Sequence, residues 1–357
     1  MKISYSQLKE WLSILRQQIE LNLNLPHVNN PNVDNPFSGF ANFLVTSTME
    51  KSWTEDRVSY KDLKTVIDSL SKTLPAYRTN TLWGKIVWWL THPQRALHAF
   101  AGEKIGAKAY HPNHHGNFCY EHQWQLQTEG GSKTITHIIG PGPGSEENLA
   151  EKITRASNAV FQTHEGKKGA KVEEDHLEDY KGWQKKYSRN VKLLHAPVNG
   201  PLWKGENLGK MVTPQQFTQY VSKSQSEYQI PMIDQMWKQS TTWFKKKFHS
   251  KINTSMSNQA CVLAFHACSA LAALEEATQQ HDNVLFLQTC KQGIDRGAVA
   301  NAATIFLNQH QDGQNSIDTK TALFIVGLLF GRALLVDDRM IMEERLEAFS
   351  ELLGALS

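Results

Sequence analysis

A cysteine and an arginine stand at the two ends of a short turn whose flanks predict a strand and a helix. Cys290 and Arg296 are separated by the five residues KQGID. Before them, Val284 to Leu287 form a short apolar run that is typical of a buried strand. After them, Ala298 to Leu307 is rich in alanine and places apolar residues at helical spacing. The pattern predicts a strand, a tight turn that starts with the cysteine, and a helix that begins near the arginine.

Such a turn would bind a tetrahedral oxyanion. Successive backbone N–H groups and the positive end of the following helix form an anion-binding concavity. Arg296 can grip two phosphate oxygens with its planar guanidinium, and the same positive field favours the thiolate form of Cys290. The predicted chemistry is attack of sulfur on phosphorus, followed by hydrolysis of a phosphocysteine intermediate. The alternative is an ordinary buried cysteine beside a salt bridge between Asp295 and Arg296.

The loop CKQGIDR resembles the signature of Cys-x5-Arg phosphatases that act on inositol lipids and inositol phosphates. In that group the loop commonly reads Cys-Lys-x-Gly-x-Asp-Arg. The resemblance is strongest to bacterial effector phosphatases of the SopB and IpgD type, with the SidF and SidP type as a further likeness. A shorter segment, Ala196 to Gly200, reads APVNG and resembles the Val-Asn motif upstream of the loop in the SopB-type group.

The resemblance implies roles for individual residues of the loop. It makes Cys290 the nucleophile and Arg296 the phosphate clamp. The substrate-binding residues that it implies are Lys291, Gln292, Gly293, Ile294 and, in the shorter segment, Asn199. Two positions depart from the family pattern: Gly297 replaces a common Thr or Ser, and Thr289 replaces a His of many classical members. These departures concern the catalytic rate more than phosphate binding.

The leaving group needs a proton, because an inositol or lipid hydroxyl leaves poorly as an anion. Asp295 is the first candidate acid, because myotubularin-like and Sac-like phosphatases, which the loop resembles, use the aspartate before the arginine. The alternative role of Asp295 is structural, since a carboxylate beside Arg296 tends to stay ionised. Asp234 and Asp179, on separate segments, are the substitutes.

Composition restricts the class of partner. The chain has 357 residues, with 38 Lys and Arg against 35 Asp and Glu, so its net charge is only +3. No global field draws the chain to nucleic acid, and a preference for anions must be local. The four cysteines show no disulfide framework and suit a reducing, cytoplasmic compartment. We expect no cofactor.

Two clusters offer either a functional or a structural interpretation. A group of histidines and a cysteine is dense enough to suggest zinc, but its spacing fits no common zinc module, so we expect polar packing and no metal. Its members are His111, His114, His115, Cys119 and His122. The second cluster consists of lysines, which either add positive charge around the predicted phosphate site or are ordinary solvated residues at a helix end. They are Lys204, Lys210, Lys245, Lys246 and Lys247.

Membrane and host contact are expectations of the same kind. Trp83, Trp88 and Trp89 fit either a helical core or peripheral contact with a membrane surface. Near the C-terminus, Glu343 to Glu347 reads EERLE and resembles the EExxE feature of effectors exported by bacterial type IV secretion. An amphipathic surface helix has the same appearance. Secretion by a bacterium into the host cytosol is therefore an expectation alongside a cytoplasmic location.

The fold class predicted is a helix-rich α/β protein. Expected helices cover 4–22, 59–74, 81–91, 145–159, 213–249 with a break near Pro231, 257–280, 298–307, 319–335 and 337–353. Expected strands cover 118–126, 134–139, 191–194 and 284–289, with 24–38 as a loop and 167–189 as a polar, solvated connection. We expect a cysteine-phosphatase-like core with a central mixed sheet at 111–357, and an additional helical cap or subdomain at 1–110.

The leading prediction is a cysteine-dependent phosphatase that acts on phosphoinositide lipids or soluble inositol polyphosphates, a phytase-like activity included. The competing class is a catalytically impaired phosphate-binding or interaction module on a phosphatase fold, because Gly297 and a missing acid would stop turnover. A protein tyrosine phosphatase is a third class, which the likeness of Lys291 and Asp295 to inositol-directed loops disfavours.

Overall fold

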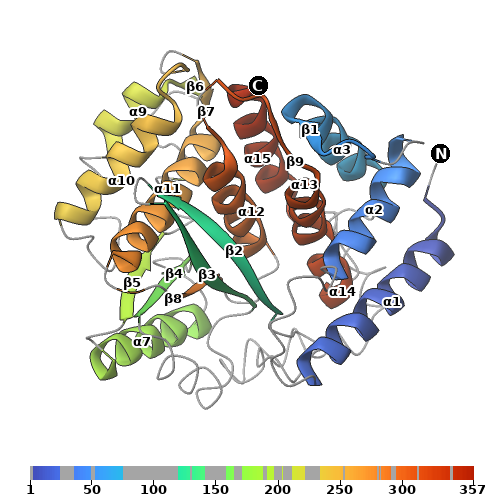
Figure 1. Cartoon of the computed structure of the whole chain (residues 1–357), viewed down its shortest axis with the longest axis horizontal. Coiled ribbons are helices and arrows are strands. Elements are labelled where there is room, and N and C mark those ends of the chain that lie inside the picture. The colour runs from blue at the N-terminus through green and yellow to red at the C-terminus, as the bar shows by residue number, and fades with distance from the viewer. Residues whose placement is uncertain are drawn as a thin grey trace.

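A five-stranded mixed sheet lies at the centre of the computed structural model (Figure 1). Its strands, in spatial order, are β2 (Tyr120–Thr128), β3 (Gly131–Ile139), β8 (Asn283–Thr289), β4 (Asn158–Thr163) and β5 (Val191–His195). Strand β2 is antiparallel to β3, and the other neighbours are parallel. The predicted α/β class with a central mixed sheet is confirmed, as is the hairpin of β2 and β3.

The structure describes the following residues: 3–24, 36–49, 53–74, 120–128, 131–140, 158–164, 171–187, 191–196, 203, 211–221, 234–251, 254–279, 281, 283–290, 295–311, 313–337 and 341–357.

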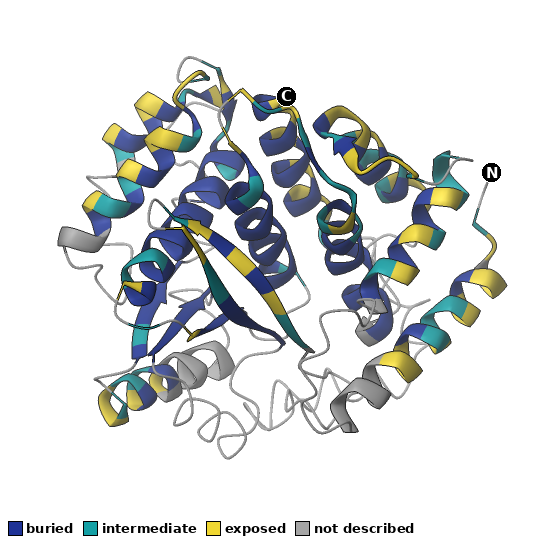
Figure 2. Ribbon diagram, in the orientation of Figure 1, coloured by how far each residue is buried: buried dark blue, intermediate teal, exposed yellow. Residues whose placement is uncertain are grey.

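Strand β8 is buried on both faces of the sheet. Because side chains alternate along a strand, Val284 and Phe286 enter the larger core while Leu285 and Leu287 enter the smaller one. Helices α11 (Asn258–Thr278) and α12 (Arg296–Gln309) cover the first face. Helix α7 (Lys171–Lys186) covers the second face (Figure 1). Helix α12 is buried along almost its whole length, as Figure 2 shows.

Helix α11 is long and apolar enough to cross a membrane by length and composition. Within the fold, however, 89% of that apolar window is buried against other elements. This burial is the behaviour of a core helix.

The prediction of a solvated connection at 167–189 is wrong, because α7 occupies most of that range. Tyr180 and Trp183, one helical turn apart, are buried and pack edge-on against Phe161 of β4, with ring centroids at 6.1 and 5.8 Å. These two aromatic side chains attach the charged helix α7 to the sheet.

Strand β4 was also not predicted, and the expected helix at 145–159 overlaps its first residues. All six of its residues are buried, so the strand has no alternation of apolar and polar side chains. A fully buried strand cannot be told from a helix by periodicity alone. Residues 141–157 lie outside the described part of the chain.

The N-terminal helices pack beside the C-terminal ones, as Figure 1 shows at its right side. They are α1 (Tyr5–Asn24), α2 (Pro36–Met49) and α3 (Tyr60–Thr73), against α13 (Thr319–Val326), the π-helical turn η4 (Gly327–Gly331), α14 (Arg332–Asp337) and α15 (Glu343–Leu356). Helices α1 and α3 were predicted, whereas α2 was not. Strands β1 (Arg57–Ser59) and β9 (Ser316–Asp318) pair between the two groups.

One glycine is required where α2 meets η4. A Cβ atom added to Gly327 would lie 2.6 Å from both Cβ and the carbonyl oxygen of Phe37. Leu8, Phe37 and Leu63 belong to the same hydrophobic core as the residues of α11 and α12. The proposed boundary near residue 110 lies outside the described residues.

The predicted helix at 213–249 is two helices, α9 (Pro214–Val221) and α10 (Asp234–Lys247). Short strands β6 (Met211–Val212) and β7 (Met256–Ser257) pair antiparallel beside them. Helix α10 packs on α11, which in turn packs on α12. These contacts place α11 between the outer helices and the helix that follows the cysteine loop.

Candidate functional site

The parallel strands of the sheet end at one edge, where Cys290 follows the central strand β8. The strand ends are joined by hydrogen bonds: His164 N–H donates to Thr289 O at 2.9 Å, and Ala196 N–H donates to Thr163 O at 2.8 Å. The Thr289 hydroxyl donates to the carbonyl oxygen of Gly140, which follows β3, at 2.7 Å. In open α/β sheets ligands bind at this carboxyl edge, so Cys290 occupies the position expected of a functional residue.

The sulfur of Cys290 faces the start of α12. The backbone N–H of Gly297, in the first turn of that helix, donates to Cys290 Sγ with an N–S distance of 3.4 Å. The first N–H groups of a helix have no acceptor within the helix and form the positive end of its dipole. The positive end of the helix is thus directed at the sulfur atom. Asp295, at the N-cap, makes no side-chain capping bond to α12.

A buried polar network fixes α12 to β8 beneath the cysteine. Asn301 Nδ2 donates to the carbonyl oxygens of Gln288 at 3.1 Å and of Gly297 at 2.7 Å. The side chain of Gln288 accepts from the Thr304 hydroxyl at 3.1 Å and donates to Gln162 on β4 at 2.5 Å. Bonded polar groups in a low-dielectric interior hold one arrangement firmly. The loop therefore leaves a rigid strand and enters a rigid helix.

Arg296 is held against the neighbouring strand. Its side chain is buried, and Nη1 donates to the carbonyl oxygen of His164 at 2.9 Å. The His164 ring donates from Nδ1 to Ala196 O at 2.8 Å. Burial lowers the pKa of His164 to about 3, and the charges of Arg296 and other neighbours add to that effect. His164 is therefore neutral near pH 7, and the positive charge stays on the guanidinium.

Asp295 joins the cysteine loop to α15. Its Oδ1 accepts a hydrogen bond from the backbone N–H of Met342 at 3.1 Å, and Met342 is the N-cap residue of α15. A bond of this kind favours the ionised carboxylate. The geometry supports the structural role of Asp295, and its role as the acid stays a prediction.

Arg345 is a residue of this region that the sequence analysis missed. It comes from α15, is only 2% exposed, and its guanidinium lies 5.5 Å from the centroid of the Trp203 ring. Burial lowers the pKa of Arg345, and Arg296 lowers it further, whereas Asp295, Glu344 and Cys290 act in the opposite direction. Arg345 is thus an electrostatic neighbour of Cys290 and of Arg296.

The helical spacing of the apolar residues around Arg345 indicates that this arginine is buried. The neighbouring glutamates favoured the interpretation of a surface helix instead. Arg345, Phe349, Leu352 and Leu356 follow one another at helical spacing and are all buried. An arginine in the apolar stripe of an amphipathic helix points inward. Glu343, Glu344 and Glu347 are exposed on the same helix, so the EExxE residues lie on the surface of an element that also contributes to the core.

Several predicted residues lie outside the part of the chain that the structure describes. They are Lys291, Gln292, Gly293 and Ile294 of the loop, Asn199, Lys204 and Lys210, the tryptophans Trp83, Trp88 and Trp89, and His111, His114, His115 and Cys119. Asp179 lies in α7 and Asp234 begins α10.

The remaining members of the two clusters have structural contacts. His122 on β2 packs against Phe324 with ring centroids 4.1 Å apart, and burial lowers its pKa to about 4. Among the described residues, no group of three or more His, Cys, Asp or Glu is arranged to hold a metal ion. Lys247 donates to the carbonyl oxygen of His310, and burial lowers its pKa to about 8. Lys245 and Lys246 are exposed.

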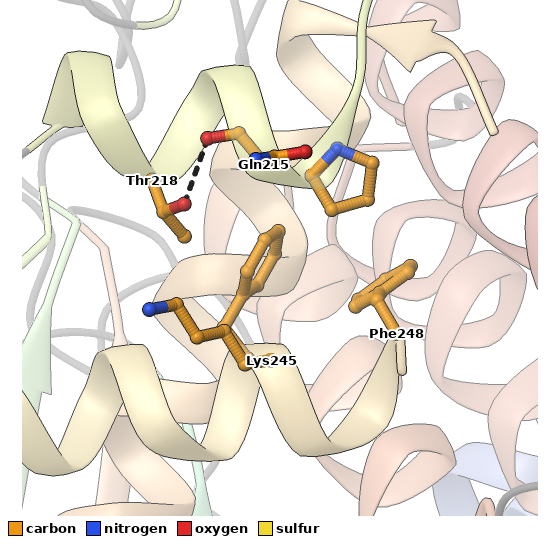
Figure 3. A pocket seen from close by; sticks show the side chains of 6 residues that line it. Gln215, Thr218, Lys245 and Phe248 are labelled. Carbon is orange, nitrogen blue, oxygen red and sulfur yellow. Dashed lines mark hydrogen bonds between the residues drawn. The ribbon is translucent and has the colours of Figure 1, made fainter. Parts of the chain in front are cut away.

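A surface hollow between α9 and α10 offers different chemistry (Figure 3). It is lined by Pro214, Gln215, Thr218, Phe244, Lys245 and Phe248. The Thr218 hydroxyl donates to the carbonyl oxygen of Gln215 at 2.9 Å. This lining has one lysine and no nucleophile paired with a cation, so the candidate active site is the region around Cys290.

No protein-family model, no curated protein and no solved structure matches the chain. What the site can do must therefore be inferred from the geometry around Cys290 and from the resemblance of its loop.

Proposed function

We propose that the chain is a cysteine-dependent phosphatase that hydrolyses phosphate monoesters of phosphoinositides or inositol polyphosphates. The observation that carries the proposal is the 3.4 Å contact from the Gly297 N–H to Cys290 Sγ at the start of α12. Arg296, buried and bound to the end of β4, lies at the same helix start. A helix N-terminus and a guanidinium together favour an oxyanion bound beside the sulfur.

The reaction has two displacement steps. In the first, Cys290 Sγ attacks phosphorus, the S–P bond forms, and the bond from phosphorus to the ring oxygen breaks. The alkoxide that leaves takes a proton from an acid. In the second, water attacks phosphorus and gives one proton to the carboxylate that acted as the acid, the S–P bond breaks, and inorganic phosphate leaves with the thiolate restored. Arg296 stabilises the charge that spreads over the phosphoryl oxygens in both steps.

The acid is assigned to Asp295, with Asp234 and Asp179 as substitutes. Asp295 precedes Arg296 directly, so its main chain is part of the loop. Its bond from the Met342 N–H must be weakened before the carboxylate can hold a proton. A movement of α15 relative to the loop would do this, and it would couple the protonation of Asp295 to the position of Arg345.

The proposal also covers the source of the substrate and the location of the protein. A phosphoinositide substrate requires peripheral contact with a membrane surface, whereas phytate and other soluble inositol phosphates do not. Within the described residues, Cys261, Cys268 and Cys290 are free and buried, which suits a reducing cytoplasm. The exposed EExxE residues of α15 agree with delivery by a bacterium into a host cytosol. The cysteine-phosphatase fold itself is part of the proposal.

A catalytically impaired phosphate-binding module is the second candidate, and two observations favour it. Gly297 has no hydroxyl to assist the departing thiolate, and the carboxylate of Asp295 is engaged with a backbone N–H. A protein with these properties would hold a phosphate group at the start of α12 without turning it over.

Phosphate release separates the candidates. The wild type and Cys290→Ser are incubated with phosphoinositides in vesicles, a short-chain soluble phosphoinositide, phytate and a phosphotyrosine peptide. Release by the wild type and none by Cys290→Ser supports the enzyme, and the vesicle and soluble arms identify the source of the substrate. Binding without release supports the module. Preference for the phosphotyrosine peptide contradicts the proposed substrate class, and neither release nor binding contradicts both candidates.

A further inference from the structure

The 3.4 Å contact between the Gly297 nitrogen and Cys290 Sγ joins two different elements. Cys290 follows β8, whereas Gly297 lies in the first turn of α12. The distance between the donor and the sulfur is therefore set by how the start of the helix is held against the end of the strand. A misplacement of about 1 Å between reacting groups can cost about 100-fold in rate. A residue that fixes this distance would act on the reaction without touching the substrate.

Asn301 bonds to both elements next to that contact. Its Nδ2 donates to the carbonyl oxygen of Gly297 at 2.7 Å and to that of Gln288, two residues before Cys290, at 3.1 Å. The residue of α12 that gives its N–H to the sulfur therefore gives its C=O to Asn301. Because Asn301 is only 1% exposed, water does not compete for these bonds.

The amide of Asn301 is itself oriented from two neighbouring strands. Trp124 Nε1 on β2 donates to His137 Nδ1 on β3 at 3.2 Å, so the proton of the neutral imidazole is on Nε2. Burial lowers the pKa of His137 to about 3 and His122 adds to this effect, whereas a hydrogen bond with the Asn301 side chain acts in the opposite direction. His137 Nε2 and Asn301 Oδ1 are both buried and have no other partner among the described residues. Oδ1 thus faces the imidazole, and Nδ2 is turned toward the two carbonyls.

We infer that Asn301 is a positioning residue for Cys290, which holds the Gly297 N–H on the sulfur. The chain of contacts runs from Trp124 through His137 and Asn301 to Gly297, and it ends at Cys290. The inference rests on the proposed function, because the effect assigned to Asn301 is on the attack of sulfur on phosphorus.

Thr304, one helical turn further along α12, provides a matched control. It is also buried, and its hydroxyl also reaches β8, through the side chain of Gln288 at 3.1 Å. This hydrogen bond does not involve Gly297. Asn301→Leu and Thr304→Val each replace a buried hydrogen-bonding side chain by an apolar one of similar shape and leave its partners unbonded. Both variants should lower the thermal midpoint, and only Asn301→Leu should affect the cysteine.

Steady-state kinetics with a short-chain soluble phosphoinositide and with phytate measure the effect on the reaction. For Asn301→Leu we expect kcat to fall about 100-fold. KM should change much less, because Arg296 is held separately by the carbonyl oxygen of His164. Asn301→Ser should recover part of the loss, because a serine hydroxyl can donate to the carbonyl four residues earlier, as Ser269 does in α11 at 2.8 Å. Thr304→Val should stay within a few-fold of the wild type.

Hydrogen exchange of the Gly297 amide, followed by NMR, reports on the contact itself and needs no activity. Asn301→Leu should raise the exchange rate of this amide about 10-fold relative to amides in the second half of α12, and Thr304→Val should not. Equal kcat values in the two variants, or equal exchange rates of Gly297, would reduce Asn301 to a structural role and overturn the inference. If Asn301→Leu does not fold, Asn301→Ser takes its place under the same criteria.

Failure of the proposed function is distinguishable from failure of this inference. When the wild type releases no phosphate but the Gly297 amide exchanges faster in Asn301→Leu alone, the phosphatase is wrong and Asn301 still holds the N–H on the sulfur. When the wild type releases phosphate and Asn301→Leu resembles Thr304→Val in kcat and in exchange, the phosphatase stands and Asn301 is not a positioning residue.

Discussion

The carbonyl oxygen of His164 accepts a hydrogen bond from Nη1 of Arg296 at 2.9 Å. His164 follows β4 and Arg296 begins α12, so this bond joins a neighbouring strand to the start of the helix behind the cysteine loop. It orients the guanidinium with one of its five donors. The guanidinium of Arg296 is therefore held in place by the sheet.

Arg296→Lys should abolish most of the phosphatase activity although the charge is retained. A lysine offers a point charge in place of the planar fork and cannot keep the His164 bond and a bidentate phosphate contact together. We expect kcat/KM to fall by about 100- to 1000-fold, the cost of losing one preorganised donor. Steady-state kinetics measure it, with Arg57→Lys, an exposed arginine on β1, as the matched control. Activity within a few-fold of the wild type would contradict the clamp.

Gly297→Ser should raise turnover, because it supplies the hydroxyl that the loop lacks. A Cβ atom at this position would lie 3.4 Å from Cys290 N and from Thr289 Cα, which is ordinary contact. The thermal midpoint should therefore change little, while kcat rises when departure of the thiolate limits the rate. Gly297→Ala is the matched control, since it adds the Cβ without the hydroxyl. Equal kcat values for the serine and alanine variants would refute the role of the hydroxyl.

Folding stability should fall as the pH decreases below about 6.5. Burial lowers the pKa of His137 and of His164 to about 3, and of His122 to about 4. Below about pH 6.5 the unfolded chain binds protons at these histidines, whereas the native chain does not. Each histidine therefore lowers the free energy of unfolding by about 1.4 kcal/mol per pH unit in this window. Urea unfolding between pH 7 and pH 5 measures the slope.

Two variants test the origin of that pH dependence. His137→Phe should reduce the slope, because it removes one titrating group that packs against Phe286 at 4.5 Å. His249→Gln, at an exposed position, should leave the slope unchanged. A slope that is unaffected by His137→Phe would assign the effect to other groups.

Substitution of alanine for each of two glycines on the C-terminal helices should change the free energy of unfolding in opposite directions. Gly327→Ala places a Cβ 2.6 Å from the backbone oxygen of Phe37 and should destabilise the fold by about 1–3 kcal/mol through overpacking. Gly354→Ala meets only the flexible side chain of Lys64, at 3.6 Å, and should stabilise α15 by about 1 kcal/mol. Urea unfolding measures both. A stable Gly327→Ala variant would show that α2 and η4 are not in close contact.

The strand before Cys290 and the helix after it could be predicted because their signals are local. An apolar run and an alanine-rich helical pattern flank the loop, and β8 and α12 have nearly the predicted bounds. The β2–β3 hairpin was predicted for the same reason, with Gly131 at a φ of 108° next to the turn.

The features that were missed depend on contacts between distant segments. Among the α7 side chains whose burial the structure describes, only Tyr180 and Trp183 are buried, and the sequence around them is charged. Strand β4 has no alternating pattern because both of its faces are covered. Arg345 is an electrostatic neighbour of Cys290 and Asp295, and the hydrogen bond from Met342 N–H to Asp295 joins the start of α15 to residue 295. No local pattern in the sequence predicts that residue 345 lies near residue 290.

The most direct measurement is the detection of the phosphocysteine intermediate. Wild-type protein is mixed with a short-chain soluble phosphoinositide or with phytate, quenched within one turnover, and digested for mass spectrometry. We predict that one phosphoryl group is attached to Cys290, and that the adduct is absent from Cys290→Ser. Phosphate release without this adduct, or release that persists in Cys290→Ser, would contradict the assignment of Cys290 as the nucleophile.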